Sequence, residues 1–469
     1  MWWHILGIAV SVGLLSLLLA VEFGHMPIVK PLKRRMQRNK RTVARLIVAQ
    51  KKRFFGSDLH RSSTLLILSQ AINAAGAFIF WMVCARLFPA HEVGLATALI
   101  SYGALIAAFT HLGLPVTVLR FLPGSKHRGG LFAAAALLVA VCSGIGGAAA
   151  VAWTHVLAPR LEFLQGSPKL QVILLALVIV TALGGLLEGV LTSLKQSQFV
   201  VKKAIATNAP RVILPFALAA LGVAGIAGLY TGALVFGALY SLWVIMHKLL
   251  RGQPLRPRFA ELRAHRKFAA ANYLGSMFGI LPATMVPLIV LAKLGPAQAA
   301  FFYMPMQLAA FLGILASSTC NALLAEVAHD DNPNHYRKHV AAAVRHLYQL
   351  LIPAAFALAI GGWVVLRIYG APYASNGYAP LLLLCAASLF VGLNWLGDAW
   401  LNIQKRSAAY FAMNALNALA VVGAVYIFAD AGLTGVAFGW LAGQVFSALL
   451  YIAIFARPQV RGLRAKLRS

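Results

Sequence analysis

The chain has 469 residues, of which 61% are hydrophobic and 11% are charged, and its mean hydropathy is +0.79. This composition excludes an ordinary soluble protein, because long apolar runs with few charges are typical of transmembrane helices. The formal net charge of +30 would suggest nucleic acid as the partner of a soluble protein. Here the basic residues stand between apolar runs, so we expect them to orient helices in a membrane and expect no nucleic-acid partner.

The apolar runs predict an all-α polytopic membrane protein with one leading helix and twelve core helices. The leading run, residues 2–21, has no basic segment before it and no clear small-residue cleavage site. We therefore interpret it as a retained membrane helix rather than as a signal peptide. The core helices are expected at residues 63–85, 93–118, 130–157, 170–194, 204–221, 227–247, 268–292, 299–325, 346–366, 379–403, 408–428 and 433–455.

The segments that connect these helices fall into two alternating sets of different charge. One set holds 35 of the 41 lysines and arginines, and the other set holds five. The basic set comprises residues 30–61, 120–128, 195–203, 248–267, 337–345, 405–406 and 457–468. Because basic loops remain in the cytoplasm, we expect a protein of the cell (inner) membrane with its C-terminus in the cytoplasm and its N-terminus outside.

Two short repeats indicate that the core consists of two related halves. ARLFPA (85–90) is matched 207 residues later by AKLGPA (292–297), and LEGVLTSLKQS (187–197) is matched 210 residues later by GDAWLNIQKRS (397–407). Six helices in each half, both starting on the same side, form parallel repeats of the kind found in transporters. We therefore expect two pseudo-symmetric six-helix lobes around a central cavity. The expected boundaries are 1–61 for the leading helix and basic segment, 62–247 for the N-lobe, 248–267 for a basic linker, 268–456 for the C-lobe and 457–469 for a basic tail.

The turn between the first two core helices carries a family resemblance. The stretch ARLFPAHEVGLATALISYGALIAAFTHLGLPVTVLRFLP (85–123) resembles the polysaccharide transporter branch of the multidrug/oligosaccharidyl-lipid/polysaccharide superfamily, which contains the Wzx-type O-antigen flippases. The matching features are Arg86, the P-x-x-E-V-G turn at 89–94, the Leu-Gly-Leu at 112–114 and Arg120. Residues 272–309 look like the corresponding start of the second half, and the resemblance covers about residues 62–456.

The resemblance implies a flippase rather than an enzyme. It implies that a polyprenyl-pyrophosphate-linked oligosaccharide moves from the cytoplasmic to the outer leaflet by alternating access. It also implies membrane lipids and a polysaccharide polymerase or glycosyltransferase as partners. The chain has no G-x-x-x-x-G-K-[ST] motif, and its four cysteines have neither metal-binding nor disulfide spacing, so we expect no cofactor and no metal.

Arg211 is the main candidate for a binding residue. It stands between two prolines in ATNAPRVILPF (206–216), about 12 Å from the basic end of its predicted helix at 1.5 Å per residue. A guanidinium in hydrocarbon costs about 2.5–3.5 kcal/mol or more, and the prolines leave backbone carbonyls unpaired, as in helices that line cavities. We expect Arg211 to face the central cavity and to attract the pyrophosphate, whereas the alternative is a structural ion pair.

Other basic residues occupy the predicted helix ends. Arg120 is expected at the cytoplasmic mouth, where it captures pyrophosphate or only anchors the helix. Arg86 and Lys293 occupy equivalent turns on the outer side and either receive the head group or cap outer loops. His111 lies within a helix and either titrates in a proton-coupled cycle or forms a structural hydrogen bond.

Two acidic residues occupy equivalent places near the cytoplasmic ends of helices. Glu188 and Asp398 each precede a lysine by seven residues, Lys195 and Lys405 respectively. They are either gate partners of these lysines or of Arg120, or permanent structural pairs. Four asparagines inside apolar helices are candidates for binding sugar hydroxyls, or for contacts between helices: Asn73, Asn208, Asn272 and Asn394.

Three other functions remain open. A drug or cation antiporter of the same superfamily would need an acidic cavity, whereas this chain has Arg211 in mid-membrane. A lipid II-type flippase has a similar fold with two further helices after the core. A membrane-embedded glycan polymerase or glycosyltransferase usually needs large outer loops with catalytic acids, and here the outer loops are short, with Glu162 and Asp430 as their acids besides Glu92.

Overall fold

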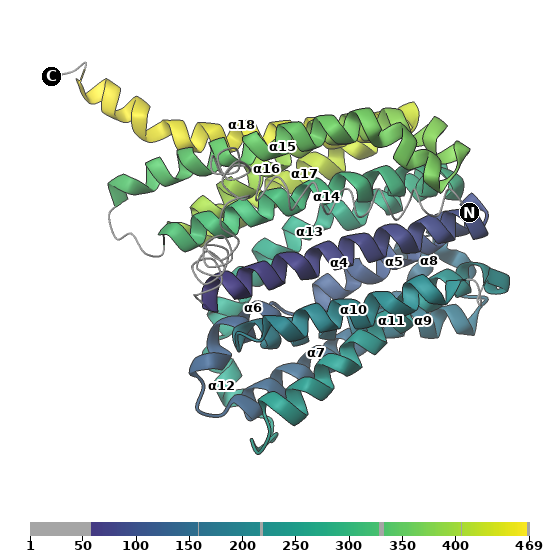
Figure 1. Cartoon of the computed structure of the whole chain (residues 1–469), viewed down its shortest axis with the longest axis horizontal. Helices are drawn as coiled ribbons and strands as arrows, with labels where there is room; N and C mark the ends of the chain where they lie inside the picture. The colour runs from purple at the N-terminus through teal and green to yellow at the C-terminus, as the bar shows by residue number, and fades with distance from the viewer. Residues whose placement is uncertain (1–57, 158, 216–218, 328–332, 405, 467–469) are drawn as a thin grey trace, which may run out of the picture.

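The computed structural model describes residues 58–157, 159–215, 219–327, 333–404 and 406–466 (Figure 1). The predicted leading helix at 2–21 and the basic segment before residue 58 lie outside the described residues. Every regular element in the described part of the chain is a helix. This confirms the predicted all-α fold.

The helices follow one another along the chain with short connections. The first half contains α4 (Asp58–Leu87), α5 (Ala90–Thr110), α6 (Leu114–Phe121), η1 (Leu122–Gly124), α7 (Arg128–Ala152), α8 (Thr154–Leu157), η2 (Pro159–Leu164), α9 (Pro168–Ser193), α10 (Ser197–Ile213), η4 (Ala219–Leu221), α11 (Gly222–Val244) and η5 (Ile245–Leu249). The second half contains α12 (Phe259–Ala264), α13 (Arg266–Leu294), α14 (Pro296–Val327), α15 (Pro333–Tyr369), α16 (Ala371–Ile403), α17 (Ser407–Phe428), η6 (Ala429–Ala431) and α18 (Gly432–Lys466). Each predicted core helix has its counterpart here.

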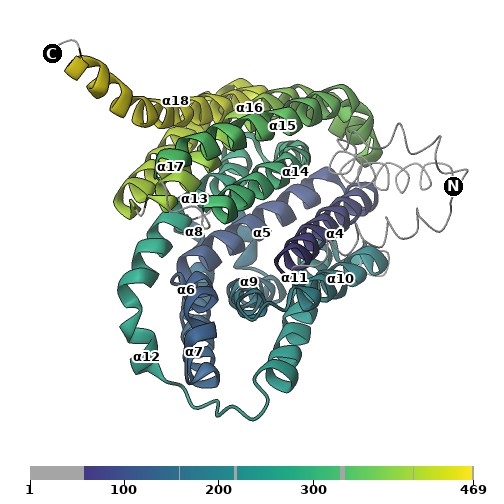
Figure 2. The same ribbon diagram turned by 60° about the vertical axis from the view of Figure 1, so that its left-hand side comes forward.

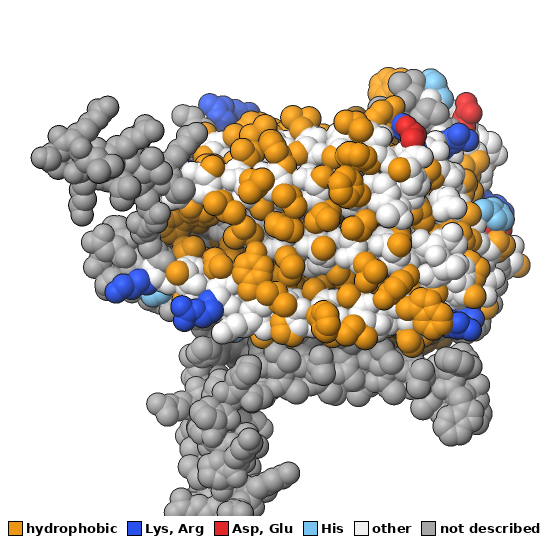
Figure 3. All heavy atoms as spheres, turned by 90° about the horizontal axis from the view of Figure 1, so that it is seen from above, with side chains coloured by type: hydrophobic (Ala, Val, Ile, Leu, Met, Phe, Trp, Pro, Cys, Tyr) orange, Lys and Arg blue, Asp and Glu red, His pale blue; other side chains and the backbone are white. Residues whose placement is uncertain are grey.

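The length and composition of these helices identify a multi-pass membrane protein. Among the described residues, ten segments are long and apolar enough to cross a membrane, and the last of them, Ser407–Phe455, contains α17 and α18 up to Phe455. Figure 3 shows apolar side chains over the flank of the molecule, with charged side chains toward its two ends. A flank of this kind suits a hydrocarbon environment.

The predicted helix at 93–118 is interrupted. α5 ends at Thr110 and α6 begins at Leu114, and between them Leu112 and Gly113 have φ angles of 52° and 66°. A Cβ on Gly113 would lie 2.7 Å from the carbonyl oxygen of Ala269 in α13, so glycine allows both the left-handed backbone and the close approach. Pro115 in the first turn of α6 was the signal, because proline favours a helix start over a helix interior.

The helices form two groups that meet mainly at α5. Helices α4 to α11, here called the N-lobe, pack largely on one another, and helices α13 to α18, here called the C-lobe, do the same. α5 packs against both α13 and α14 of the C-lobe (Figure 2).

The linker between the lobes packs on the N-lobe. The backbone N–H of Arg258 donates to the carbonyl oxygen of Gly130 at 3.1 Å, and Ser125 Oγ donates to Glu261 Oε1 at 2.6 Å. Leu262 of α12 is buried. We call the end of the molecule that carries this linker the basic end, and the end at which α4 and α15 terminate the far end.

Candidate functional site

Arg211 is buried inside the N-lobe. Its side chain is 6% exposed, and it lies on α10, which begins at Ser197 rather than at residue 204 as predicted. The fourteen residues from Ser197 place it about 21 Å along the helix at 1.5 Å per residue, so it is deeper than the sequence suggested. Neither of the ion pairs found among the described residues involves it.

The contacts of Arg211 are an aromatic ring and one weak hydrogen bond. Its guanidinium carbon lies 4.1 Å from the ring centroid of Tyr230 on α11, and Nη1 donates to Asn208 Oδ1 at 3.5 Å. Its Nε and Nη2 are buried and have no hydrogen-bond partner among the described residues. The guanidinium therefore has two buried donors that no described residue accepts.

The cation–π contact with Tyr230 does not fully offset the free-energy cost of burying the charge of Arg211. A desolvated cation–π contact contributes about 2 kcal/mol, whereas an arginine at the centre of a membrane helix costs about 2.5–3.5 kcal/mol on the lowest scale. The hydrogen bond to Asn208 is at the outer limit of length. An anion bound at Arg211 would offset the remaining cost.

Aromatic residues connect the Arg211 site to the C-lobe. Trp81 of α4 lies 6.5 Å from Tyr230 and 5.0 Å from Tyr303 of α14, measured between ring centroids. Gln307 Nε2 donates to Tyr303 Oη at 2.5 Å. Trp81 therefore links the aromatic partner of Arg211 to the C-lobe, and the position of Arg211 in a central cavity stays a prediction. The aromatic partners were not predicted.

Two of the candidate asparagines are joined beside Arg211. Asn208 is buried and its Nδ2 donates to Asn73 Oδ1 at 2.8 Å, while Asn73 itself is exposed. A polar path thus leads from an exposed group on α4 to the buried guanidinium on α10. Whether these amides bind sugar remains a prediction.

The N-lobe acid Glu188 has a different partner from those expected. Its Oε2 lies 2.9 Å from Lys203 Nζ, and Lys203 also donates to the carbonyl oxygen of Gly184. Lys195 is exposed at the turn between α9 and α10, and Arg120 lies over the ring of Phe268 on α13. Lys203 was missed because it was assigned to a loop, whereas it lies in α10 two turns before Arg211 and on the same face.

The C-lobe acid Asp398 is enclosed by hydrogen-bond donors. Asn414 Nδ2 donates to its Oδ1 at 2.9 Å, and the hydroxyl of Tyr451 donates to the same oxygen. The predicted partner Lys405 lies outside the described residues. Both of these partners of Asp398 belong to the C-lobe, and a role of Asp398 as a gate residue stays a prediction.

Arg120 and His111 both contact the C-lobe near the basic end. The guanidinium of Arg120 lies 4.6 Å from the ring centroid of Phe268 on α13. His111 Nδ1 accepts a hydrogen bond from the backbone N–H of Gly113 at 3.0 Å and its ring lies edge-on to Tyr273. His111 thus supports the break between α5 and α6, and its predicted titration in transport is not tested by this geometry.

Arg86 and Lys293 lie at the far end but make different contacts. Arg86 donates to the carbonyl oxygens of Ile368 and Arg367 at the end of α15. Lys293 Nζ lies 3.0 Å from both carboxylate oxygens of Asp430. Although their positions in the repeat are equivalent, Arg86 therefore binds the end of α15 and Lys293 binds the turn between α17 and α18.

The two remaining candidate asparagines, Asn394 and Asn272, belong to the C-lobe. Asn394 is buried, and its Nδ2 donates to Gln444 Oε1 at 2.8 Å inside the C-lobe, which is a contact between helices. Asn272 belongs to α13, but its side chain lies outside what the structure describes.

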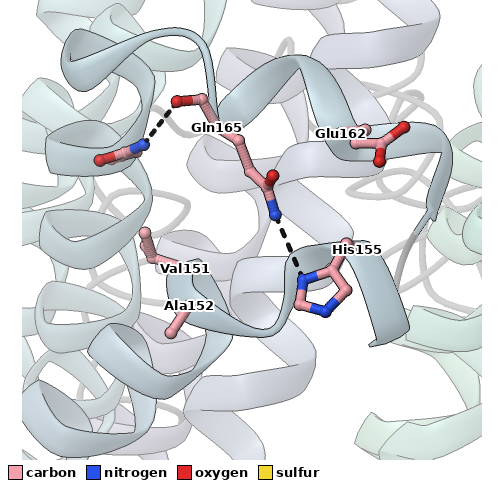
Figure 4. Close-up of a pocket in the computed structure, with 6 residues that line it drawn as sticks. Val151, Ala152, His155, Glu162 and Gln165 are labelled. Atoms are coloured by element: carbon pink, nitrogen blue, oxygen red, sulfur yellow. Dashed lines mark hydrogen bonds between the residues drawn. The ribbon is translucent and has the colours of Figure 1, made fainter.

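Two surface cavities lie at the far end, away from Arg211. One has a volume of about 660 Å³ and is lined by Val151, Ala152, His155, Glu162, Gln165 and Gln171. Figure 4 shows Gln165 directed toward His155, whose Nδ1 lies 3.3 Å from Gln165 Nε2. The other, of about 410 Å³, is lined by Trp363, Arg367, Ala371, Pro372, Ala374 and Ser375. Neither contains a predicted site residue.

The described residues contain no cluster of three or more histidine, cysteine, aspartate or glutamate side chains that could hold a metal ion. The cysteines Cys84, Cys320 and Cys385 are buried and free, and Cys142 is partly buried and free.

Comparison with known proteins shows what fold the chain has. No protein-family model matches it, and no curated protein matches it significantly. Among solved structures it is similar to a multidrug resistance MATE family transporter of the MOP superfamily in an inward-facing conformation, with 13% identity and a TM-score of 0.65 over 85% of this chain and 99% of that one. An outward-facing structure of such a transporter gives 15% identity and a TM-score of 0.57 over 87% and 96% of the two chains.

A third solved structure is a MOP superfamily transporter from Pyrococcus furiosus, described as having a binding pocket of reverse polarity that suggests a different function. The identity is 14% and the TM-score is 0.60, over 87% of this chain and 96% of that one. All these identities are low, so the similarity concerns the fold. The chain thus has the fold of MATE-type transporters of the MOP superfamily.

Proposed function

We propose that the protein is a MOP superfamily transporter that carries an anionic lipid-linked glycan, a polyprenyl-pyrophosphate oligosaccharide, across the membrane by alternating access. The observation that carries the proposal is Arg211, a buried cation inside the N-lobe with two donors that have no partner among the described residues. Its action is binding and release, without a chemical step. The basic end would face the cytoplasm of the inner membrane.

The chemistry of this substrate fits the site. A pyrophosphate carries about two negative charges and several acceptor oxygens, which suit a guanidinium with free donors. The glycan is polar and would need hydrogen-bonding groups such as the Asn73–Asn208 pair. The polyprenyl tail remains in the bilayer, against the apolar flank.

The comparisons support a transporter and allow more than one type of substrate. The similar solved structures are described as transporters, and the pocket of one of them is described as having reverse polarity. A cation in place of an acidic group is one form that a reversal of polarity can take. Arg211 supports an anionic cargo on these grounds.

A drug or cation antiporter is the second candidate, and Asp398 favours it. This carboxylate lies inside the C-lobe, on a helix predicted to cross the membrane. However, Asn414 and Tyr451 already donate to it. One oxygen of Asp398 therefore has donors already, whereas two donors of Arg211 have no partner among the described residues.

The test is a thermal unfolding assay of the purified protein with two kinds of ligand. Undecaprenyl pyrophosphate should stabilise the protein, by about 2.7 kcal/mol at a concentration of one hundred times the dissociation constant. Undecaprenol and the cationic dye ethidium should have no effect. Stabilisation by ethidium without stabilisation by the pyrophosphate would replace the proposal with the antiporter. Lipid II and an O-antigen-type lipid can then be compared in the same assay to identify the glycan.

A further inference from the structure

Arg86 joins the two lobes at the far end of the molecule. It is in the last turn of α4 in the N-lobe. Its Nε donates to the carbonyl oxygen of Ile368 at 2.7 Å, and its Nη2 donates to that of Arg367 at 3.0 Å. Both carbonyls are in the last turn of α15 in the C-lobe, where the helix itself leaves carbonyl oxygens unpaired and where its dipole attracts a cation.

The surfaces beside Arg86 are in direct contact. A Cβ on Gly94 at the start of α5 would lie 1.7 Å from the carbonyl oxygen of Pro296 at the start of α14, so the two backbones touch. The rings of Phe78 and Tyr369 meet edge to face, 5.3 Å apart. The far end of the lobe interface is therefore closed, and Arg86 forms hydrogen bonds across it.

The equivalent residue of the C-lobe provides an internal comparison. Lys293 corresponds to Arg86 at the 207-residue offset of the repeat. It is bound to Asp430, between α17 and α18, and lies 4.3 Å from the ring centroid of Tyr426 on α17. All three residues belong to the C-lobe, so Lys293 holds one lobe together whereas Arg86 connects two.

We propose that Arg86 is a latch that holds the far end of the lobe interface closed, and that its two hydrogen bonds must break before cargo can leave at that end. The inference depends on the proposed alternation between two states. Hydrogen bonds to a charged group are strong enough to shift a two-state equilibrium by about tenfold. Loss of the latch therefore favours the state that is open at the far end.

The experiment measures the distance between two spin labels across the far end, in lipid nanodiscs, by pulsed electron–electron double resonance. Spin labels are attached at His91→Cys in the N-lobe and Ser375→Cys in the C-lobe, both exposed positions, in a Cys142→Ala background, since the other three cysteines are buried. Arg86→Ala should add a longer-distance population, about tenfold more than in the parent protein. Arg86→Lys, which keeps the charge but loses the forked geometry, should give an intermediate result.

Lys293→Ala is the matched control and should leave the distance distribution unchanged. An unchanged distribution in Arg86→Ala would remove the latch, and an equal effect of Lys293→Ala would show that any cation at this end matters. If Arg86→Ala expresses poorly, Arg86→Gln provides the same comparison with a polar side chain. No substrate is present, so failure here leaves the ligand assay untouched, and failure of the pyrophosphate to bind leaves the latch result valid.

Discussion

The two lobes have related sequences but place their buried charge differently. At the 210-residue offset, Arg211 of the N-lobe corresponds to Val421 of the C-lobe, and Asn208 corresponds to Ala418. Val421 and Ala418 are fully buried. The C-lobe instead has the partly buried acid Asp398, whose Oδ1 accepts hydrogen bonds from Asn414 and Tyr451.

The close packing of the C-lobe explains why it has no counterpart of Arg211. A Cβ on Gly443 of α18 would lie 2.5 Å from the Cα of Val421 on α17, so the two helices approach too closely for a long side chain between them. In the N-lobe the corresponding space holds the guanidinium over Tyr230. At this position the C-lobe is therefore closely packed with apolar residues, whereas the N-lobe has a buried charge without an ion-pair partner among the described residues. This difference predicts that mutations at equivalent positions have different consequences.

The largest expected effect is that of Arg211→Ala. Charged hydrogen bonds contribute about 1.5–3 kcal/mol, so the affinity for undecaprenyl pyrophosphate should fall about tenfold or more, since 1.4 kcal/mol is tenfold. Surface glycan should be lost at an unchanged protein level, measured by glycan staining beside an immunoblot. Arg211→Lys should retain part of the activity.

Val421→Ala at the equivalent position is the control, and it should weaken folding without weakening ligand affinity. Full export by Arg211→Ala would remove Arg211 from the transport mechanism and with it the contrast between the lobes.

The second effect concerns stability rather than binding. Asp398→Ala leaves Asn414 and Tyr451 without their acceptor, so the free energy of unfolding should fall by about 1–3 kcal/mol. Denaturant unfolding in detergent measures this change. Export per folded molecule should remain near that of the parent protein. Intact folding combined with loss of ethidium transport would instead assign Asp398 to a cation antiporter.

A smaller effect is expected at the ring beneath Arg211. Tyr230→Leu removes the cation–π contact and should lower the free energy of unfolding by about 0.5–2 kcal/mol. Tyr230→Phe keeps the aromatic face and should change it little. Equal destabilisation by both variants would show that the hydroxyl, rather than the ring, stabilises the buried charge.

Several contacts of the N-lobe were accessible from the sequence in principle. Antiparallel neighbours bring together residues at equal distances from their turn, as in Arg211 and Tyr230 on either side of Ala219–Leu221. The same relation joins Glu188 to Lys203 across the turn between α9 and α10. Hydropathy located the helices, because membrane spans have a strong signal, and this geometry would then have added the partners.

Contacts between the lobes had no such signal. Trp81 meets Tyr303, and Arg86 meets Ile368, across more than two hundred residues of chain. The relative position of the two lobes depends on side-chain packing between them, and no periodic pattern in the sequence indicates that packing. The helix break at Leu112 was also missed although Pro115 signals it, because the neighbouring residues are apolar and fit a continuous helix.

The smallest expected effect distinguishes a structural pair from a gate. Glu188 and Lys203 are partly exposed, with side chains 43% and 15% exposed, so their ion pair should contribute less than about 1 kcal/mol to the free energy of unfolding. Glu188→Gln should therefore change stability much less than Asp398→Ala, although the two acids are equivalent in the repeat. Lys202 is the exposed neighbour of Lys203, and Lys202→Ala is the control for the loss of one charge in this part of α10. If Glu188→Gln abolished export while the protein stayed folded, this pair would take part in transport as a gate, and the N-lobe would hold two functional charges where the C-lobe holds a structural one.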